Sequence, residues 1–392
     1  RYSTTGSSRL CNAQPLLRQF HMGPVAVAHN GNLVNAEELR RHFEERGHIF
    51  QSTTDTEVIV HLLADPQHRR HSDPLASVLR QLRGAFCLLF LFPDRIEAAR
   101  DPWGVRPLSL GRTADGHPCV ASETCAFDAI GATFERDVEP GEIVRIDDTG
   151  VHSRRFVQAG DEGARCLFEH VYFANPASRV FGQNVHLVRQ ELGRQLARES
   201  GVRADCVMPM PDSGRSAALG FARESGLTLE EGIVPNRFVG RTFILPEQPQ
   251  RDQAVGMKLN IIAELVRGRR IVVVDDSIVR GTTTLSKMRA LRHAGAREIH
   301  LRISCPPIRH PCYYGIDFPT PDELIANQRT VEQVRQFLEV DSLAYLSLEG
   351  LIACSKLASP QCCTACWSGK YKIPTPMPRC AKSEIPNPHA QV

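Results

Sequence analysis

The clearest hydrophobic pattern in the chain is a short apolar run that leads directly into two carboxylates. Residues 271–274 are all isoleucine or valine, which is typical of the central strand of a parallel sheet. Asp275 and Asp276 follow, and after a threonine-rich turn apolar residues recur at helical spacing from Leu285 to Leu291. The pattern therefore predicts a strand, a turn and a helix in succession.

The rest of the second half alternates between helix-like and strand-like patterns. Apolar residues have helical spacing over 185–196 and 213–222, and strand-like runs occupy 206–210 and 299–304. Such alternation predicts an α/β domain with a parallel, doubly wound sheet. A further helix is predicted at 331–338, where Thr330 and Gln333 have the spacing of a capping box.

The first half has a different pattern, with short β-type runs separated by turn residues. These runs are 25–29, 85–92, 107–111, 119–122 and 142–146. Asn30-Gly31 and residues 139–141 are predicted to be turns. We therefore expect an α+β domain with an antiparallel sheet.

A polar, glycine-containing stretch at 158–163 marks the change between the two patterns. We place a first domain at 1–157, a second at 158–350, and a cysteine-containing C-terminal segment at 351–392. From residue 368 onward proline is frequent and periodicity is lost, so this tail is expected to be irregular.

The turn after residues 271–274 has the features of a sugar-phosphate site. Gly281, Thr282 and Thr283 lie where a helix begins, and helix N-termini favour phosphate through free N–H groups and the helix dipole. Asp275 and Asp276 can accept hydrogen bonds from vicinal hydroxyls or bind Mg²⁺. The glycine spacing is that of neither a dinucleotide fingerprint nor a P-loop. Each feature alone is more often a cap, but together they favour a ligand site.

Two other segments are candidates for the same site. Asp212 and Ser213 lie in a second strand-to-helix turn, which could hold a pyrophosphate or could be a plain connection. Residues 236–258 include Arg241 and Lys258 and lack periodicity. Such a segment is usually a solvated loop, but beside an anionic ligand it suits a closing lid.

These motifs resemble a known family. The matching stretches in the second half are 211–213, 236–243, 258–259 and 274–283, and those in the first half are 1–4, 29–33, 52–57, 101–107, 121–124 and 139–142. Together they are similar to the glutamine phosphoribosylpyrophosphate (PRPP) amidotransferases, over about residues 1–371. The resemblance implies an N-terminal-nucleophile (Ntn) glutaminase domain followed by a type I phosphoribosyltransferase domain.

The implied reaction makes 5-phosphoribosylamine from PRPP and glutamine-derived ammonia, with release of pyrophosphate and glutamate, as the first step of purine synthesis. In the second domain the resemblance assigns the 5-phosphate to Gly281, Thr282 and Thr283. It assigns the ribose hydroxyls and Mg²⁺ to Asp275 and Asp276. It assigns the binding of Mg²⁺-pyrophosphate to Asp212 and Ser213. Arg241 and Lys258 would belong to the lid.

In the first domain the resemblance assigns the oxyanion hole to Asn30 and the N–H of Gly31. Arg1 would pair with the glutamine carboxylate and Asp55 with its α-ammonium group. The family's nucleophile is an N-terminal cysteine, and Cys11 does not match its position. We therefore expect that a preceding segment is missing, and that the chain as given uses ammonia but does not hydrolyse glutamine.

Cysteine is frequent, with 13 residues, which favours a reducing compartment and hence the cytoplasm. Cys363 and Cys366 form a Cys-x-x-Cys pair, which suits Zn²⁺, an iron-sulfur cluster or a redox dithiol. By resemblance to the iron-sulfur members of the family, Cys166 and Cys312 would complete the ligands of a 4Fe-4S cluster.

Composition and the family resemblance together limit the kinds of partner that the protein is expected to have. A net charge of +3 without a basic run, and the absence of an apolar run of membrane-spanning length, argue against nucleic acid and membrane partners. The resemblance implies PRPP, glutamine or ammonia as substrates, purine nucleotides as inhibitors, and a homo-oligomer, a tetramer in the family. Pro235 replaces a lysine that is frequent in the family, so altered feedback inhibition is expected.

Three alternatives remain open at this point. A phosphoribosyltransferase that attaches a base would leave the first domain unexplained. An ammonia-only phosphoribosyltransferase would fit if no segment preceded Arg1. A PRPP-binding regulator without catalysis should add a DNA-binding motif, and none is evident in the sequence.

Overall fold

The computed structural model describes residues 9–158, 160, 162–236, 259–318 and 320–375. Its N-terminal half contains a six-stranded antiparallel sheet in the order β1-β2-β3-β4-β8-β9. The strands are β1 (Leu16–Phe20), β2 (Gly23–Leu33), β3 (Gly84–Leu91), β4 (Ile96–Arg100), β8 (Glu142–Asp147) and β9 (Gly150–Arg155). The antiparallel sheet predicted for the first half is confirmed.

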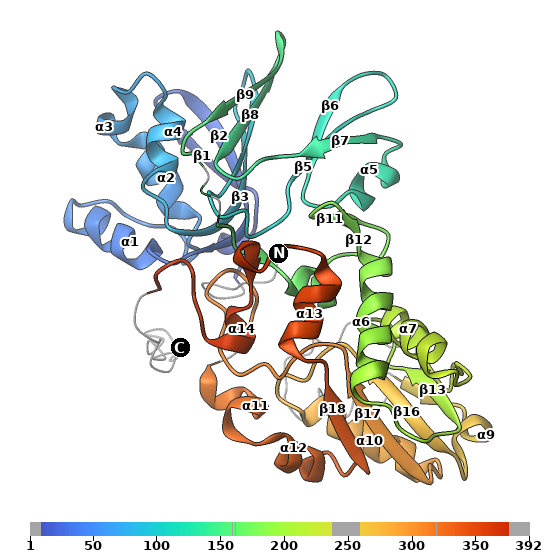
Figure 1. The fold of residues 1–392 in the computed structure, drawn as a ribbon. Helices are drawn as coiled ribbons and strands as arrows, with labels where there is room; N and C mark the ends of the chain where they lie inside the picture. The colour runs from blue at the N-terminus through green and yellow to red at the C-terminus, as the bar shows by residue number, and fades with distance from the viewer. Residues whose placement is uncertain (1–8, 159, 161, 237–258, 319, 376–392) are drawn as a thin grey trace.

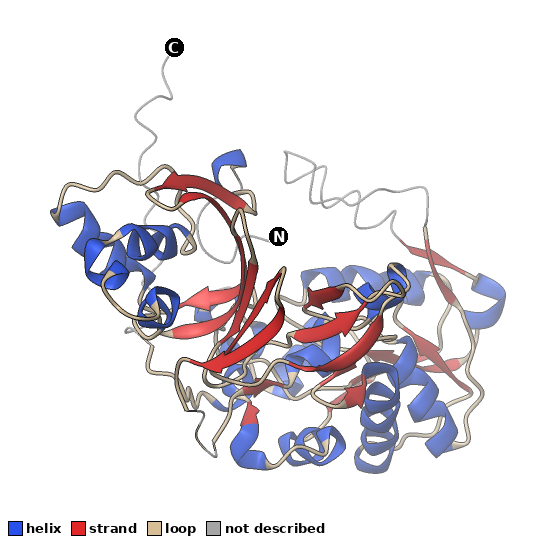
Figure 2. Cartoon of the chain, turned by 90° about the horizontal axis from the view of Figure 1, so that it is seen from above, coloured by secondary structure: helices blue, strands red, loops and turns tan. Residues whose placement is uncertain are grey.

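Two further layers cover this sheet. Helices α1 (Ala36–Glu45), α2 (Glu57–Ala64), α3 (Pro66–Arg69) and α4 (Pro74–Leu79) lie beside it (Figure 1). A three-stranded antiparallel sheet formed by β5 (Ser109–Arg112), β6 (Pro118–Ala121) and β7 (Thr133–Asp137) packs through a separate apolar cluster, and α5 (Cys125–Ala129) lies next to β7. Figure 2 shows the long strands as a curved layer.

The C-terminal half is built on a parallel sheet in the order β13-β16-β17-β18. Its strands are β13 (Cys206–Pro209), β16 (Arg270–Asp275), β17 (Glu298–Ile303) and β18 (Ser342–Tyr345). Helices α6 (Val185–Glu199), α7 (Arg215–Ser225), α10 (Thr282–His293) and α12 (Val331–Phe337) surround it (Figure 1). Residues 271–274 are completely buried, as their composition predicts.

Shorter elements complete the described chain. The short strands pair as β10 (Arg165–Cys166) with β19 (Cys362–Cys363), β11 (Arg179–Val180) with β12 (Gln183–Asn184), and β14 (Ile233–Pro235) with β15 (Leu259–Ile261). The short helices are η1 (Leu10–Asn12), the π-helical η2 (Glu169–Phe173), α9 (Ala263–Val266), η4 (Pro321–Glu323), α11 (Ile325–Gln328), α13 (Leu348–Ser355), η5 (Ser359–Gln361) and α14 (Ala365–Ser368). The predicted boundary at residue 350 falls inside α13, and the pairing of β10 with β19 returns the C-terminal segment to the middle of the molecule (Figure 1).

Two local predictions have opposite outcomes. The capping box on α12 is present, since Thr330 Oγ1 accepts from the N–H of Gln333 and Gln333 Oε1 accepts from the N–H of Thr330. The turn predicted at Asn30-Gly31 is wrong, because both residues lie inside β2. Glycine there serves close strand packing, since a Cβ on Gly31 would lie 2.1 Å from the carbonyl oxygen of Ala85.

Most of the predicted C-terminal tail, residues 376–392, lies outside the described residues. None of the helices in the described part of the chain is both long and apolar enough to cross a lipid bilayer.

Candidate functional site

Asp275 and Asp276 lie at the carboxyl end of the central strand β16, as predicted. Asp275 is the last residue of the strand, and both side chains are buried, 6% and 5% exposed. The N–H of Asp276 donates to Asp275 Oδ1 at 2.9 Å, and Ser277 Oγ donates to Asp276 Oδ1. These bonds fix the two carboxylates next to each other at the sheet edge where α/β proteins bind ligands.

The two carboxylates of this pair repel each other. Burial raises the pKa of Asp275, the neighbouring charge of Asp276 raises it further, and Lys287 offsets part of the effect. A buried pair of like charges is stabilised by a cation or by hydroxyl donors. The carboxylates therefore suit Mg²⁺ or the diol of a sugar.

The turn that follows places a helix N-terminus beside the carboxylates. Gly281 is the N-cap of α10 with φ +80°, a left-handed conformation that favours glycine. The first intrahelical bond runs from the N–H of Leu285 to Gly281 O at 2.8 Å, and the side chains of Thr282 and Thr283 are exposed. Their N–H groups belong to the first turn, which a helix leaves without intrahelical acceptors, so the loop can bind a phosphate.

The second strand-to-helix turn meets the first at the same edge. Pro209 pairs with Val274, and the N–H of Met210 donates to Val274 O at 2.8 Å. A Cβ on Gly214 would lie 2.3 Å from that same oxygen, so glycine permits the close approach of this turn. The structure thus brings Asp212 and Ser213 to the edge that carries Asp275 and Asp276.

In the N-terminal half Asn30 and Gly31 lie in the β2–β3 ladder, opposite Cys87 and Phe86. Gly31 has φ +145°, which L side chains rarely adopt. The structure therefore holds the predicted oxyanion residues on a rigid strand.

Asp55 is brought to the same end of β2 but is 2% exposed. Its Oδ2 accepts from the N–H of Leu33 at 3.0 Å and lies 3.4 Å from His29 Nδ1. The carboxylate thus braces the strand next to Asn30 and Gly31. Three other candidate residues, Arg1, Arg241 and Lys258, lie outside the described residues.

The four predicted cluster ligands converge from three segments. Cys166 and Cys363 are directly paired in β10 and β19, and Cys366 follows on α14. Cys312 Sγ accepts from the N–H of Tyr314 at 3.3 Å. Burial raises the pKa of each of the four thiols, and at Cys166, Cys363 and Cys366 the charge of at least one other of the four raises it further. Within the described ranges no three His, Cys, Asp or Glu side chains are placed to hold a single metal ion.

Lys287, Arg106 and Glu169 are charged residues near these sites that the sequence did not single out. Lys287 follows Thr283 by one helical turn, so the spacing alone could have predicted that both residues lie on the same face of the helix. Arg106 and Glu169 form an ion pair with Nη1 and Oε1 2.7 Å apart. These two residues are 63 positions apart, and no local pattern joins them.

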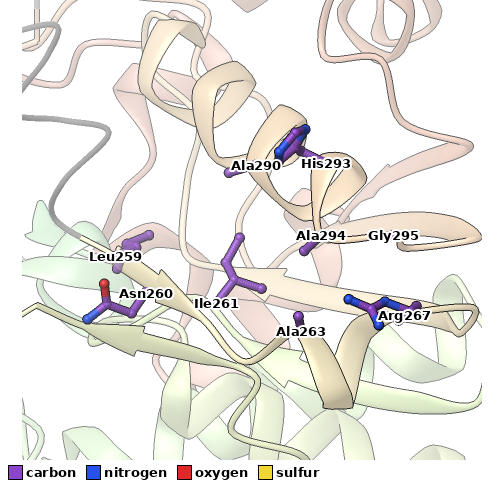
Figure 3. Close-up of a pocket in the computed structure, with 9 residues that line it drawn as sticks. All are labelled: Leu259, Asn260, Ile261, Ala263, Arg267, Ala290, His293, Ala294 and Gly295. Carbon is purple, nitrogen blue, oxygen red and sulfur yellow. The ribbon is translucent and has the colours of Figure 1, made fainter.

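A separate hollow of about 660 Å³ lies at the other end of α10, between β15, α9 and the helix C-terminus (Figure 3). It is lined by Leu259, Asn260, Ile261, Ala263, Arg267, Ala290, His293, Ala294 and Gly295. The carboxylate pair and the threonine turn are absent from this lining, so the hollow is distinct from the predicted PRPP edge.

The two halves define a glutamine amidotransferase joined to a phosphoribosyltransferase-type sheet. Residues 6–129 match the family model described as "Glutamine amidotransferase domain". The chain is 48% identical over 373 residues to the chloroplastic amidophosphoribosyltransferase of Vigna aconitifolia, covering 95% of this chain and 76% of that protein. It is 48% identical over 376 residues to the amidophosphoribosyltransferase of Bacillus subtilis, covering 95% and 79%.

A solved structure agrees with these relatives. The glutamine PRPP amidotransferase of B. subtilis, complexed with ADP and GMP, superposes with a TM-score of 0.86 at 45% identity, covering 95% of this chain and 82% of that chain. The chain belongs to the amidophosphoribosyltransferase family. This confirms the predicted family, fold class and enzyme class.

Proposed function

We propose that the protein forms 5-phosphoribosylamine from PRPP and ammonia derived from glutamine, the reaction that opens purine nucleotide synthesis. One observation carries this proposal for the chain itself. The buried pair Asp275-Asp276, the threonine turn that opens α10 and the turn holding Ser213 all meet at one edge of a parallel sheet. That edge offers groups for a sugar, a phosphate and a leaving pyrophosphate.

The residues of this edge act by holding PRPP for in-line displacement. N–H groups and hydroxyls of Thr282 and Thr283 bind the 5-phosphate, and the carboxylates of Asp275 and Asp276 accept from the ribose hydroxyls. Positive charge develops on the sugar as pyrophosphate leaves, so nearby carboxylates favour the transition state electrostatically. Arg241 and Lys258 would cover the anionic groups as a lid.

Ammonia would come from the N-terminal half. Asn30 and the Gly31 N–H would stabilise the oxyanion formed at the glutamine amide, Arg1 would bind the glutamine carboxylate, and Asp55 would bind its ammonium group. The fixed strand, which the buried Asp55 braces through the N–H of Leu33, supports the oxyanion assignment, because an oxyanion hole requires donors that do not rearrange.

We assign Mg²⁺ to Asp275, Asp276 and Ser213, on the evidence of the buried, adjacent carboxylate pair, whose charge Lys287 offsets only in part. The ion would neutralise charge on the leaving pyrophosphate. We assign a 4Fe-4S cluster to Cys166, Cys312, Cys363 and Cys366. The fit rests on four converging thiols, two buried (Cys166 and Cys366) and two partly buried, and on the buried Nε of Arg106, which lacks an acceptor among the described residues.

Regulation and location are extensions of the same proposal. Purine nucleotides are expected to inhibit, as the ADP and GMP in the related structure suggest, and Pro235 is expected to alter that response. A homo-oligomer, by family resemblance a tetramer, is expected in solution. None of the described cysteines is paired in a disulfide, which supports a reducing compartment such as the cytoplasm.

The test is release of pyrophosphate from PRPP in the presence of Mg²⁺, with either ammonium chloride or glutamine as the nitrogen donor. The double variant Asp275→Asn, Asp276→Asn should lower the ammonia-dependent rate at least about 100-fold, because the sugar cation loses its neighbouring charges. Asp205→Asn is the matched control, since Asp205 pairs with Arg270 at the opposite end of β16.

Two results would contradict the proposal. If a purine base replaced ammonia as the acceptor, the protein would be a base-attaching phosphoribosyltransferase. If PRPP bound without any pyrophosphate release, it would be a PRPP-binding regulator.

A further inference from the structure

Arg106 joins the two halves of the molecule. It lies in the loop between β4 and β5 of the N-terminal half and is 3% exposed. Its Nη1 lies 2.7 Å from Glu169 Oε1, and its Nη2 donates to Gly315 O at 3.3 Å. Both partners belong to the C-terminal half, so this one buried guanidinium crosses the junction.

The partners of Arg106 lie on the two segments that carry Cys166 and Cys312. Glu169 comes three residues after Cys166, and Gly315 comes three residues after Cys312. The N–H of Cys166 also donates to the carbonyl of Val105, the residue before Arg106, at 3.1 Å. Burial alone would lower the pKa of Arg106, but Glu169 and the two cysteines raise it, so the guanidinium stays charged beside them.

One donor of this guanidinium is left over. Arg106 Nε is buried and has no hydrogen-bond partner among the residues that the structure describes. A buried donor without an acceptor costs about 1–3 kcal/mol. The cost is avoided if the acceptor is a sulfur of a group that the cysteines hold.

We propose that Arg106 is a positioning residue of the four-cysteine centre, donating from Nε to a cluster or cysteine sulfur while its two other nitrogens hold Glu169 and Gly315. The inference rests on the cluster assigned above. Hydrogen bonds and neighbouring charge tune iron-sulfur clusters, and residues beyond the ligands orient them. Here the tuning group comes from the glutamine half, so the centre is completed only when both halves are packed together.

The test compares three variants of the holoprotein, purified without oxygen. Arg106→Lys keeps the charge beside Glu169 but removes the forked donor set. Glu169→Gln removes the negative charge that partly neutralises the guanidinium, so the positive charge of Arg106 acts more strongly on the sulfurs. Arg189→Lys is the matched control, because Arg189 is equally buried and donates to the backbone carbonyls of His170 and Ala174.

The readouts are iron and sulfide content, the terminal Fe–S stretching frequencies by resonance Raman, and the rate at which air bleaches the visible absorption. A donor on sulfur withdraws electron density and weakens the Fe–S bond. We expect higher frequencies and faster bleaching in Arg106→Lys, the opposite shift in Glu169→Gln, and wild-type behaviour in Arg189→Lys. Loss of iron from Arg106→Lys alone would also support the proposal.

Equal frequencies in Arg106→Lys and wild type, or a shift in the same direction in all three variants, would overturn it. Wild-type protein purified without oxygen and without iron would overturn it too. Ammonia-dependent pyrophosphate release measured on the same samples tells these outcomes apart from a failure of the proposed function.

Discussion

In the C-terminal sheet Asp275 is the last residue of its strand, whereas in the N-terminal sheet Asn30 and Gly31 lie inside one. At the strand end the backbone leaves the ladder, and the next helix begins with N–H groups free for a ligand. Inside β2 these two residues are paired with Cys87 and Phe86 of β3. The first arrangement depends on local sequence, and the second depends on neighbouring strands.

The two glycines at these sites show the same difference. A Cβ on Gly31 would meet the backbone of Ala85, at 2.1 Å from its oxygen, and the strand ladder gives that oxygen no room to move. A Cβ on Gly281 would meet the tip of the Ile325 side chain at 2.7 Å, and a side chain can rotate away. The N-terminal site should therefore tolerate change less than the C-terminal one.

Gly31→Ala is the largest expected effect. Alanine at this position would have an unfavourable positive φ, and its Cβ would overlap the backbone of Ala85. Together these two effects should lower the free energy of unfolding of the N-terminal half by at least about 3 kcal/mol. Gly281→Ala, at φ +80°, should cost about 1–2 kcal/mol. Urea unfolding followed by circular dichroism measures both, and equal losses would break the contrast between the two sites.

Asp275→Asn tests the cost of the carboxylate pair and gives a pH-dependent result. Burial and the charge of Asp276 raise the pKa of Asp275 from 3.8 to about 7, so the folded protein binds its proton more tightly than the unfolded chain. Stability without ligand must therefore fall as pH rises between these values, and the variant escapes that loss. With EDTA and no PRPP, we expect Asp275→Asn to be about 1–3 kcal/mol more stable than wild type at pH 8.

The advantage should nearly vanish at pH 4, where Asp275 is protonated in the folded protein and about half protonated in the unfolded chain. Asp205→Asn should act in the opposite direction at pH 8, since the hydrogen bonds from Arg270 lower the pKa of Asp205 and favour its charged form in the folded state. Thermal denaturation from pH 4 to 8 measures both variants. A pH-independent difference for Asp275→Asn would mean that the carboxylate pair is not strained by its own charge.

The same contrast explains how far the sequence could be interpreted. Residues 271–274 predicted a buried strand, and the residues after it predicted a phosphate turn, because strand end, glycine and threonines are consecutive. For Asn30-Gly31 the local pattern predicted a turn, and it was wrong because the reason for the glycine lies on β3, more than 50 residues away. Only the family resemblance pointed to a role there.

Contacts across the junction were beyond prediction for the same reason. The Arg106–Glu169 ion pair joins segments that share no periodicity. The same is true of Gly315 and Gly31, whose backbones lie so close that a Cβ on Gly315 would be 2.9 Å from Gly31. The burial of Asp55 beneath β2 likewise depends on tertiary packing. The assignments of Arg1, Arg241 and Lys258, and both proposed cofactors, stay predictions.

The smallest expected effect concerns a purely local feature of the C-terminal half, the capping box of α12. Thr330→Ala removes the acceptor for the N–H of Gln333 and should lower the free energy of unfolding by about 1 kcal/mol. Thr330→Ser keeps the hydroxyl and should restore most of that loss. Because the cap is no part of the carboxylate edge, ammonia-dependent pyrophosphate release should be unchanged in both variants. A larger loss from Thr330→Ala than from Gly281→Ala would show that local order outside the ligand edge, rather than the edge itself, limits the stability of this half.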